Sequence, residues 1–157
     1  MQQPELDATD LRILAHLQQH GRVSNLELAE AVHLSAAQCH RRHRRLEERG
    51  VVQRYEARLD AARLGLGVMA YVHVTMERGH IREVDKFREL IRGMGQVMEC
   101  YAVTGDFDYV LKVVARDLKT LSDFLLKTLA LLPGVNGVRS SVCLDEVKCT
   151  GALPLDA

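Results

Sequence analysis

The chain has 157 residues, enough for one ordinary domain or two small ones. Its hydrophobic content of 47% excludes an intrinsically disordered protein. Lys plus Arg and Asp plus Glu number 21 each, so net charge argues neither for nor against a nucleic-acid partner. No targeting segment precedes Asp7, and no apolar run approaches the ~20 residues of a membrane span. We therefore expect a cytoplasmic protein with no membrane partner.

The first expected helix begins at Asp7. The side chains of Asp7 and Asp10 are spaced to cap the free backbone amides of its first turn. Leucines then recur at helical spacing, at Leu11, Leu14 and Leu17. This pattern predicts a short amphipathic helix with one buried side.

The region that follows predicts two further helices joined by a tight turn. Each begins with a capping box, in which a Ser side chain and a Glu or Gln three residues on satisfy each other's amides. The boxes are Ser24 with Glu27 and Ser35 with Gln38, and only residues 32–34 remain for the turn. This is the pattern of a helix-turn-helix, whose second helix lies in the major groove of DNA. The sequence therefore predicts binding to double-stranded DNA.

The second of these helices carries arginines on its outer side. Its inward stripe consists of Cys39, His43 and Leu46, and at ~100° per residue Arg41 and Arg44 lie nearly opposite that stripe. Arg42 lies nearer the core edge, where it can tether the helix or reach a phosphate. The alternative is an ordinary solvated charged face. The residues expected to contact or position DNA are Ser24, Ser35, Ala37, Gln38, His40, Arg41, Arg42, Arg44, Arg45 and Arg54.

Apolar and polar side chains alternate along the segment Val51–Leu59, which predicts a strand or small wing that crosses the DNA backbone. Arg54 and Arg58 are its candidate phosphate contacts, although plain surface arginines are an equally open interpretation. Asp60 begins a brief capped helical turn. Residues 1–58 are therefore expected to form a winged helix-turn-helix domain, and residues 59–67 a linker.

From residue 68 the pattern is that of an α+β domain extending over residues 68–157. Strands are expected at Val68–Met76, Val97–Thr104, Tyr109–Ala115 and Val135–Val147, and helices at Val84–Ile91 and after Asp117. The order βαββαβ is the ferredoxin-like arrangement, with two helices on one face of an antiparallel sheet. The open face is expected to pair with another subunit, and the candidate residues for it are Tyr71, Val110, Val114 and Val142.

Several motifs stand in register from about Leu6 to Lys148. They are LDATDLRIL (6–14), GRVSNLELA (21–29), LSAAQC (34–39), TGDFDY (104–109), LPGV (132–135) and DEVK (145–148). Together with the helix-turn-helix and the βαββαβ order, they closely resemble the Lrp/AsnC family of feast/famine regulators. Within that family the chain is most similar to the leucine-responsive branch.

The resemblance implies a transcriptional regulator that dimerises through its C-terminal domain and assembles further to an octamer. It also implies a free amino acid as effector, and the branch points to leucine or another apolar amino acid. We then expect association with the nucleoid. The effector residues that the resemblance implies, the last of them from a partner subunit, are Tyr101, Thr104, Gly105, Asp106, Asp108 and Ser140.

The effector loop has a physical interpretation of its own. Asp106 or Asp108 could hold the ammonium of an amino acid through a charge-assisted hydrogen bond, and backbone amides around Gly105 could face its carboxylate. The alternative is that Gly105 and Asp106 only build the hairpin turn.

One position of the recognition helix departs from the family. His43 stands where relatives usually place Val or Ile. Its ring could be buried and neutral with a bonded polar edge, or it could titrate near neutral pH and make DNA affinity depend on pH.

Three other functions compete with an amino-acid-responsive regulator. The first is a DNA-organising protein of the same family that has no effector. The second is an enzyme, which is disfavoured because no catalytic set of side chains can be placed. The third is a metal sensor built on Cys143 and Cys149, whose spacing supports only weak convergence. We therefore predict no catalytic residue, metal site or cofactor.

Overall fold

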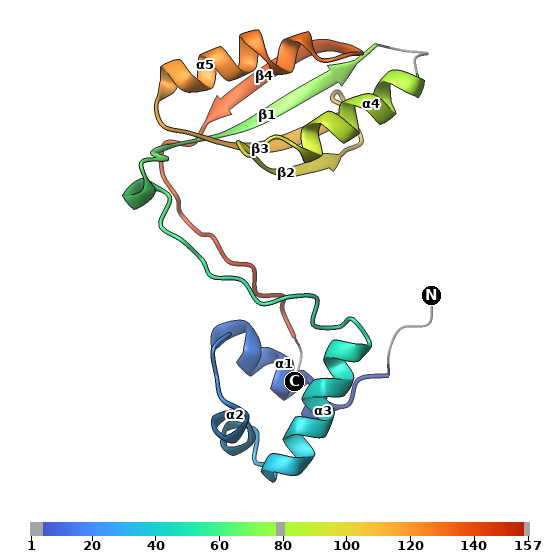
Figure 1. The fold of residues 1–157 in the computed structure, drawn as a ribbon, viewed down its shortest axis with the longest axis vertical. Helices are drawn as coiled ribbons and strands as arrows, with labels where there is room; N and C mark the ends of the chain where they lie inside the picture. The colour runs from blue at the N-terminus through green and yellow to red at the C-terminus, as the bar shows by residue number, and fades with distance from the viewer. Residues whose placement is uncertain (1–4, 78–80, 156–157) are drawn as a thin grey trace. The chain divides into compact units, whose positions relative to one another are not determined.

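The computed structural model describes residues 5–77 and 81–155. Contacts divide the chain into two units (Figure 1). One comprises the described parts of Met1–Arg58 and Lys148–Ala157, and the other comprises the described parts of Leu59–Val147. The sequence pattern assigned all residues from 68 on to the second domain. The structure instead groups the residues from Lys148 on with the first unit.

The described part of the first unit contains three helices: α1 (Ala8–Gln19), α2 (Asn25–Ala31) and α3 (Ala36–Glu48). All three begin with the caps that the sequence predicts, at Asp7, Ser24 and Ser35, and each cap is a reciprocal capping box. Such a cap stabilises a helix by about 1 kcal/mol, because it satisfies amides that have no partner inside the helix. The caps therefore fix where each helix starts and how short the turn between α2 and α3 must be.

His33 makes that turn tight. Its φ of 57° is in the left-handed region, which ends α2 within one residue of Val32. The next amide, Leu34 N–H, then donates back to the Ala29 carbonyl at 2.9 Å. The chain reaches the cap of α3 at Ser35 directly afterwards, which is the short connection expected of a helix-turn-helix.

The buried side chains of α1, α2 and α3 form one small core. It consists of Ile13, Leu14, Leu17, Leu28, Ala29, Val32, Cys39 and Leu46. The predicted inward stripe of α3 is therefore confirmed for Cys39 and Leu46. His43 lies at the edge of the core instead, with its side chain 21% exposed, and its ring makes a polar contact that the next section describes.

The prediction of a strand over Val51–Leu59 is wrong. Val51 and Val52 pack against the first core, but the described backbone from there to Leu59 forms no strand and its side chains are exposed. An alternating pattern forms a strand only where a second strand accepts its backbone hydrogen bonds. The brief helical turn after Asp60 is confirmed as a 3-10 turn at Ala62–Leu64, where Asp60 accepts from the Arg63 amide.

The second unit is the expected ferredoxin-like βαββαβ fold. Its elements are β1 (Val68–Met76), α4 (Ile81–Arg92), β2 (Val97–Ala102), β3 (Tyr109–Ala115), α5 (Leu118–Lys127), a 3-10 turn (Leu129–Leu131) and β4 (Val135–Val142). The sheet has the order β2-β3-β1-β4, and each neighbouring pair is antiparallel. Both helices cover the same face of this sheet (Figure 1). The last strand ends at Val142, earlier than the predicted Val147.

Strand register decides which residues face the helices. Ala70, Val72 and Val74 of β1 are fully buried under α4 and α5, so Tyr71 and its cross-strand neighbour Lys112 lie on the open face. Tyr71 is 44% exposed there, as the alternation predicts. Val142 was also expected on the open face, which is wrong because it pairs with Ala70 on the helix side.

Candidate functional site

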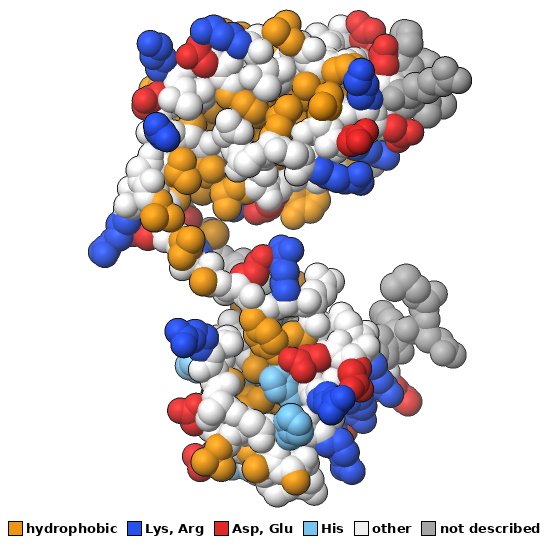
Figure 2. All heavy atoms as spheres, viewed as in Figure 1, with side chains coloured by type: hydrophobic (Ala, Val, Ile, Leu, Met, Phe, Trp, Pro, Cys, Tyr) orange, Lys and Arg blue, Asp and Glu red, His pale blue; other side chains and the backbone are white. Residues whose placement is uncertain are grey.

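The outer face of α3 presents four exposed side chains, at Ala37, His40, Arg41 and Arg44. Arg44 forms an ion pair with Glu48 at 2.8 Å, one turn further along the helix, and both side chains are well exposed. Arg41 has no ion pair within residues 5–77 and 81–155. In Figure 2, Lys, Arg and His side chains gather where Figure 1 draws α3. This face can offer positive charge to phosphates and donors to base edges.

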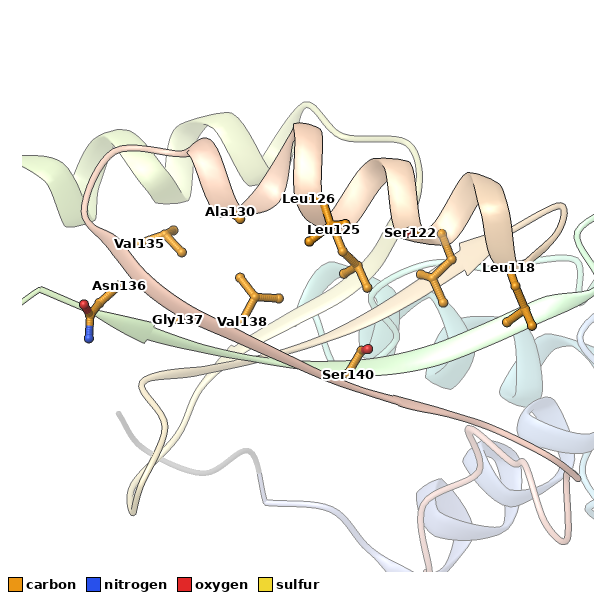
Figure 3. Close-up of a pocket in the computed structure, with 11 residues that line it drawn as sticks. Leu118, Ser122, Leu125, Leu126, Ala130, Val135, Asn136, Gly137, Val138 and Ser140 are labelled. Atoms are coloured by element: carbon orange, nitrogen blue, oxygen red, sulfur yellow. The ribbon is translucent and has the colours of Figure 1, made fainter.

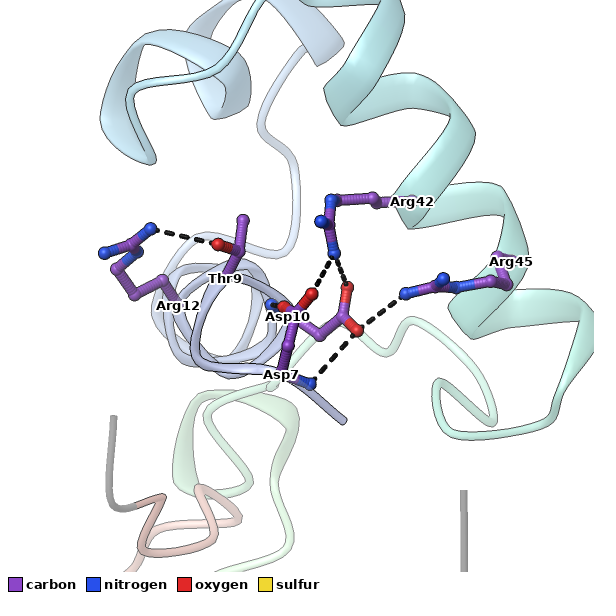
Figure 4. Close-up of polar contacts among 6 residues, drawn as sticks. All are labelled: Asp7, Thr9, Asp10, Arg12, Arg42 and Arg45. Atoms are coloured by element: carbon purple, nitrogen blue, oxygen red, sulfur yellow. Dashed lines mark hydrogen bonds and ion pairs between the residues drawn. The ribbon is translucent and has the colours of Figure 1, made fainter. Parts of the chain in front are cut away.

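Two further arginines of α3, Arg42 and Arg45, point the other way, toward α1 (Figure 4). One nitrogen of Arg42 donates to Asp7 at 2.7 Å and to Asp10 at 2.9 Å. Arg45 donates to the second oxygen of Asp10 at 2.6 Å. The structure therefore separates the arginines of the recognition helix into an outward pair and an inward pair.

The remaining predicted DNA residues have local partners. The side chains of Ser24, Ser35 and Gln38 take part in the helix caps. Arg54 forms an exposed ion pair with Glu56 at 2.6 Å, in the extended segment where a wing was expected. All four side chains are exposed, and their part in DNA binding stays a prediction.

A polar contact ties α3 to the segment that follows it. Nε2 of His43 lies 2.5 Å from the Tyr55 hydroxyl, which donates to Glu47 at 3.0 Å. When the Tyr55 proton is on the Glu47 side, the His43 ring donates its own N–H to the phenolic oxygen. Burial of the phenol, together with its hydrogen bond to Glu47, raises the pKa of Tyr55 to about 12. His43 therefore has a bonded polar edge, as one of the two sequence interpretations expected.

The turn between β2 and β3 borders a polar cavity of about 490 Å³. Gly105 has a φ of 113°, a backbone conformation that glycine adopts more readily than residues with a side chain. Asp108 accepts the Met76 amide hydrogen at 2.7 Å, which joins the turn to the end of β1. The cavity is lined by Thr75, Met76, Glu77, Gly105, Asp106, Asp108 and Asn136.

Half of the residues predicted for the effector site do not line this cavity. Tyr101 pairs across the sheet with Val110 on the open face, where the negative charge of Glu99 raises its pKa. Thr104 is exposed in the turn itself. Ser140 lines a second groove of about 490 Å³ between α5 and β4, in which leucine and valine side chains predominate (Figure 3).

Sequence reasoning missed four lining residues, at Thr75, Met76, Glu77 and Asn136. They come from the end of β1 and the start of β4, which the sheet brings beside the turn. The only signal available was the position of these residues at strand ends, since ends of neighbouring strands lie at the same edge of a sheet.

Comparison with known proteins identifies both units. Residues 69–153 match the model of the Lrp/AsnC ligand binding domain, and residues 6–53 match that of the winged helix-turn-helix DNA-binding domain. The chain belongs to the Lrp/AsnC family. The fold predicted from sequence, a helix-turn-helix followed by a ferredoxin-like domain, is the fold of this family.

Named relatives of the Lrp/AsnC family resemble the chain over nearly its whole length. The leucine-responsive regulatory protein of Haemophilus influenzae is 39% identical over 150 residues, which cover 96% of this chain and 90% of that protein. A transcriptional regulator of Neisseria meningitidis, crystallised as a complex with L-methionine, superposes with a TM-score of 0.94 at 38% identity, covering 97% of this chain and 98% of that one. An AsnC family regulator of Agrobacterium tumefaciens gives a TM-score of 0.90 at 32% identity, covering 96% and 98%.

Family membership gives this Lrp/AsnC protein its general function. It is a DNA-binding transcriptional regulator with a ligand-binding domain, and it is not an enzyme, because its relatives are regulators. Among the described residues, no helix is both long and apolar enough to cross a membrane.

Proposed function

We propose that this regulator binds double-stranded DNA through the outer face of α3 and responds to a small apolar amino acid, leucine or a close analogue. DNA binding would keep the protein with the nucleoid. The cavity beside Gly105 and Asp108 carries the effector half of this proposal. The Neisseria meningitidis regulator, crystallised with L-methionine, supports an apolar amino acid as the ligand class.

On the DNA side, Arg41 and Arg44 supply the outward charge of the recognition helix. Arginine contacts phosphates and also binds the O6 and N7 edge of guanine with two hydrogen bonds. His40 and Ala37 lie nearer the start of the helix, where helix-turn-helix proteins contact base edges. We infer that these four side chains read the site, and that the salt bridge of Arg44 to Glu48 yields to phosphate because exposed ion pairs are weak.

On the effector side, the two carboxylates of the turn differ in what they already bind. Asp108 uses one oxygen to accept the Met76 amide, so its other oxygen is the acceptor for a ligand ammonium. Asp106 is exposed and forms no hydrogen bond or ion pair with the described part of the chain. We infer that Asp106 and Asp108 together hold the ammonium, and that a partner subunit covers the apolar side chain.

We also infer that the chain is a homodimer that assembles further, to an octamer. The open sheet face, with Tyr71 at 44% exposure and Tyr101 at 58%, supports a partner subunit on that face. A two-fold dimer would place its recognition helices about 34–36 Å apart, or a multiple of that distance, on a pseudo-palindromic site. An effector bound between dimers would then change the assembly and the number of sites occupied together.

One observation favours the alternative, a DNA-organising protein without an effector. The hydrogen bond from the Met76 amide to Asp108 gives the turn a structural role. If that were its only role, the cavity would be filled with water, and amino acids would change neither stability nor DNA binding.

A thermal-shift screen of the purified protein against the standard amino acids separates the two functions. A ligand that binds only the folded state stabilises it by about 2.7 kcal/mol at 100 times its dissociation constant. We expect a shift with leucine or methionine and none with aspartate or lysine. A flat response to all of them would leave the DNA-organising function as the better conclusion.

A further inference from the structure

We propose that Asp10 positions the recognition helix, and that it does so by holding Arg42 and Arg45 away from DNA. Arg41 and Arg44 are then the only arginines of α3 that meet phosphates or bases. This inference rests on the proposed role of α3 in DNA binding. It divides four neighbouring arginines, which look equivalent in the sequence, into two pairs with different tasks.

Asp10 occupies an unusual position for a charged side chain. It is the third residue of α1, on the same helical face as the core residues Ile13, Leu14 and Leu17, and it is only 1% exposed. A buried carboxylate that lacks partners is strongly unfavourable, so its partners decide whether the unit folds. Both Asp10 oxygens have one, because Arg42 binds Oδ1 at 2.9 Å and Arg45 binds Oδ2 at 2.6 Å.

These bonds fix α3 against α1 in direction as well as in distance. Arg42 and Arg45 stand three residues apart on one face of α3. Their two guanidinium groups therefore bind the Asp10 carboxylate from adjacent turns of the helix. Asp7 adds a further bond between α3 and the start of α1, since the same Arg42 nitrogen donates to Asp7 at 2.7 Å (Figure 4). Ion pairs to a buried carboxylate contribute little net stability compared with apolar packing, and here they join α1 and α3 in one relative orientation.

The charge balance of the helix supports the same division. Four arginines within residues 41–45 repel one another, and the carboxylates of Asp7 and Asp10 neutralise the inward two. Arg42 and Arg45 each donate from one guanidinium nitrogen to Asp10, and moving either side chain toward a phosphate would take a partner from this buried carboxylate, which is unfavourable. Arg41 has no such tie in the described part of the chain.

Salt titration of DNA binding distinguishes a positioning arginine from a contacting one. Each phosphate contact contributes about 0.9 to the slope of log affinity against log salt. The probe is a labelled duplex that the wild-type protein selects from a random library. We expect Arg45→Gln to weaken binding at least fivefold while the slope stays that of the wild type, and Arg41→Gln to lower the slope by about 0.9. A lower slope for Arg45→Gln would overturn the assignment.

A double-mutant cycle tests whether Arg45 acts through Asp10. We expect Asp10→Asn to weaken DNA binding, and Arg45→Gln to add little in that background because the contact is already lost. Independent, additive effects would contradict the inference. If Asp10→Asn does not fold, the salt dependence of DNA binding by Arg45→Gln still tests the inference. This variant should fold, because the Arg45 side chain is 41% exposed.

Failure of DNA binding through α3 would give a different result from failure of the positioning role of Asp10. A wild-type protein that selects no duplex would overturn DNA binding through α3. Hydrogen exchange then tests positioning alone: Asp10→Asn should make the α3 amides exchange faster than those of α2. Unchanged protection of α3 would refute the positioning role of Asp10.

Discussion

The side chain of Gln18 and the backbone of Leu153 hydrogen bond to each other in both directions. The Leu153 amide donates to Oε1 of Gln18 at 2.6 Å, and Nε2 of Gln18 donates to the Leu153 carbonyl at 3.1 Å. Leu155, two residues on, packs against the core of the helix-turn-helix unit. Residues 148–155 are therefore part of the DNA-binding unit, and the backbone passes between the two units a second time after β4.

Leu155→Ala should destabilise the helix-turn-helix unit by about 1 kcal/mol, because a partly buried leucine loses its apolar contacts. Urea unfolding followed by circular dichroism measures the change. Leu144→Ala is the matched control, since Leu144 is 98% exposed and its truncation should leave the midpoint unchanged. Equal midpoints for both variants would mean that the tail contributes nothing to this unit.

Replacing Arg41 and Arg44 together by Ala should weaken DNA binding and lower its salt dependence without unfolding the protein. Removal of two phosphate or guanine contacts reduces the salt slope by up to about 1.8, at 0.9 per phosphate. Fluorescence anisotropy over a range of salt concentrations gives the slope. Arg63→Ala, which removes an exposed arginine outside the helix-turn-helix, should have no effect. An unchanged slope in the double variant would remove α3 from the DNA interface.

Asp108→Asn and Asp108→Ala should separate the structural and the ligand-binding roles of the turn. Asn can still accept the Met76 amide but carries no charge, so the protein should stay stable and lose its thermal shift with the amino acid. Ala removes the acceptor as well, which should lower stability by about 1 kcal/mol. Dimers should persist in both variants by analytical ultracentrifugation. A retained ligand response in Asp108→Asn would assign the ammonium to another group.

Tyr55 should contribute a stability that is lost at alkaline pH. Its pKa is raised in the folded state, from 10.0 to about 12, so the folded protein favours the protonated phenol. That stability is fully present below pH 10 and disappears as the pH rises through about 12. Tyr55→Phe should therefore unfold with a weaker pH dependence between these values. An identical pH dependence in the two proteins would show that folding does not raise the pKa of Tyr55.

Local chemistry was enough to predict most of the fold. Each helix of the first unit starts at a cap whose residues lie within four positions of one another, at Asp7, Ser24 and Ser35. Such contacts depend on nearby sequence alone. The βαββαβ order likewise followed from alternation and turn residues. The strand expected over residues 51–59 failed because pairing needs a distant partner that local alternation does not reveal.

The candidate sites were less accessible to sequence reasoning. The motif TGDFDY located Gly105, Asp106 and Asp108, but the residues facing them come from β1 and β4, whose ends meet only in the sheet. Helical periodicity correctly placed Arg41 and Arg44 outward and put Arg42 at the core edge. Arg45 was expected among the residues that contact or position DNA, and the structure bonds its side chain to Asp10.

The sequence by itself determined where the helices and most strands form, which family the chain resembles and which helix carries the basic residues. Those properties depend on contacts a few residues apart and on the periodicity of apolar side chains. Only the tertiary structure decided which arginines are tied to Asp10, which strand ends border the cavity and where the tail from Lys148 packs. These depend on groups separated by tens of residues, and long-range packing determines which of them meet.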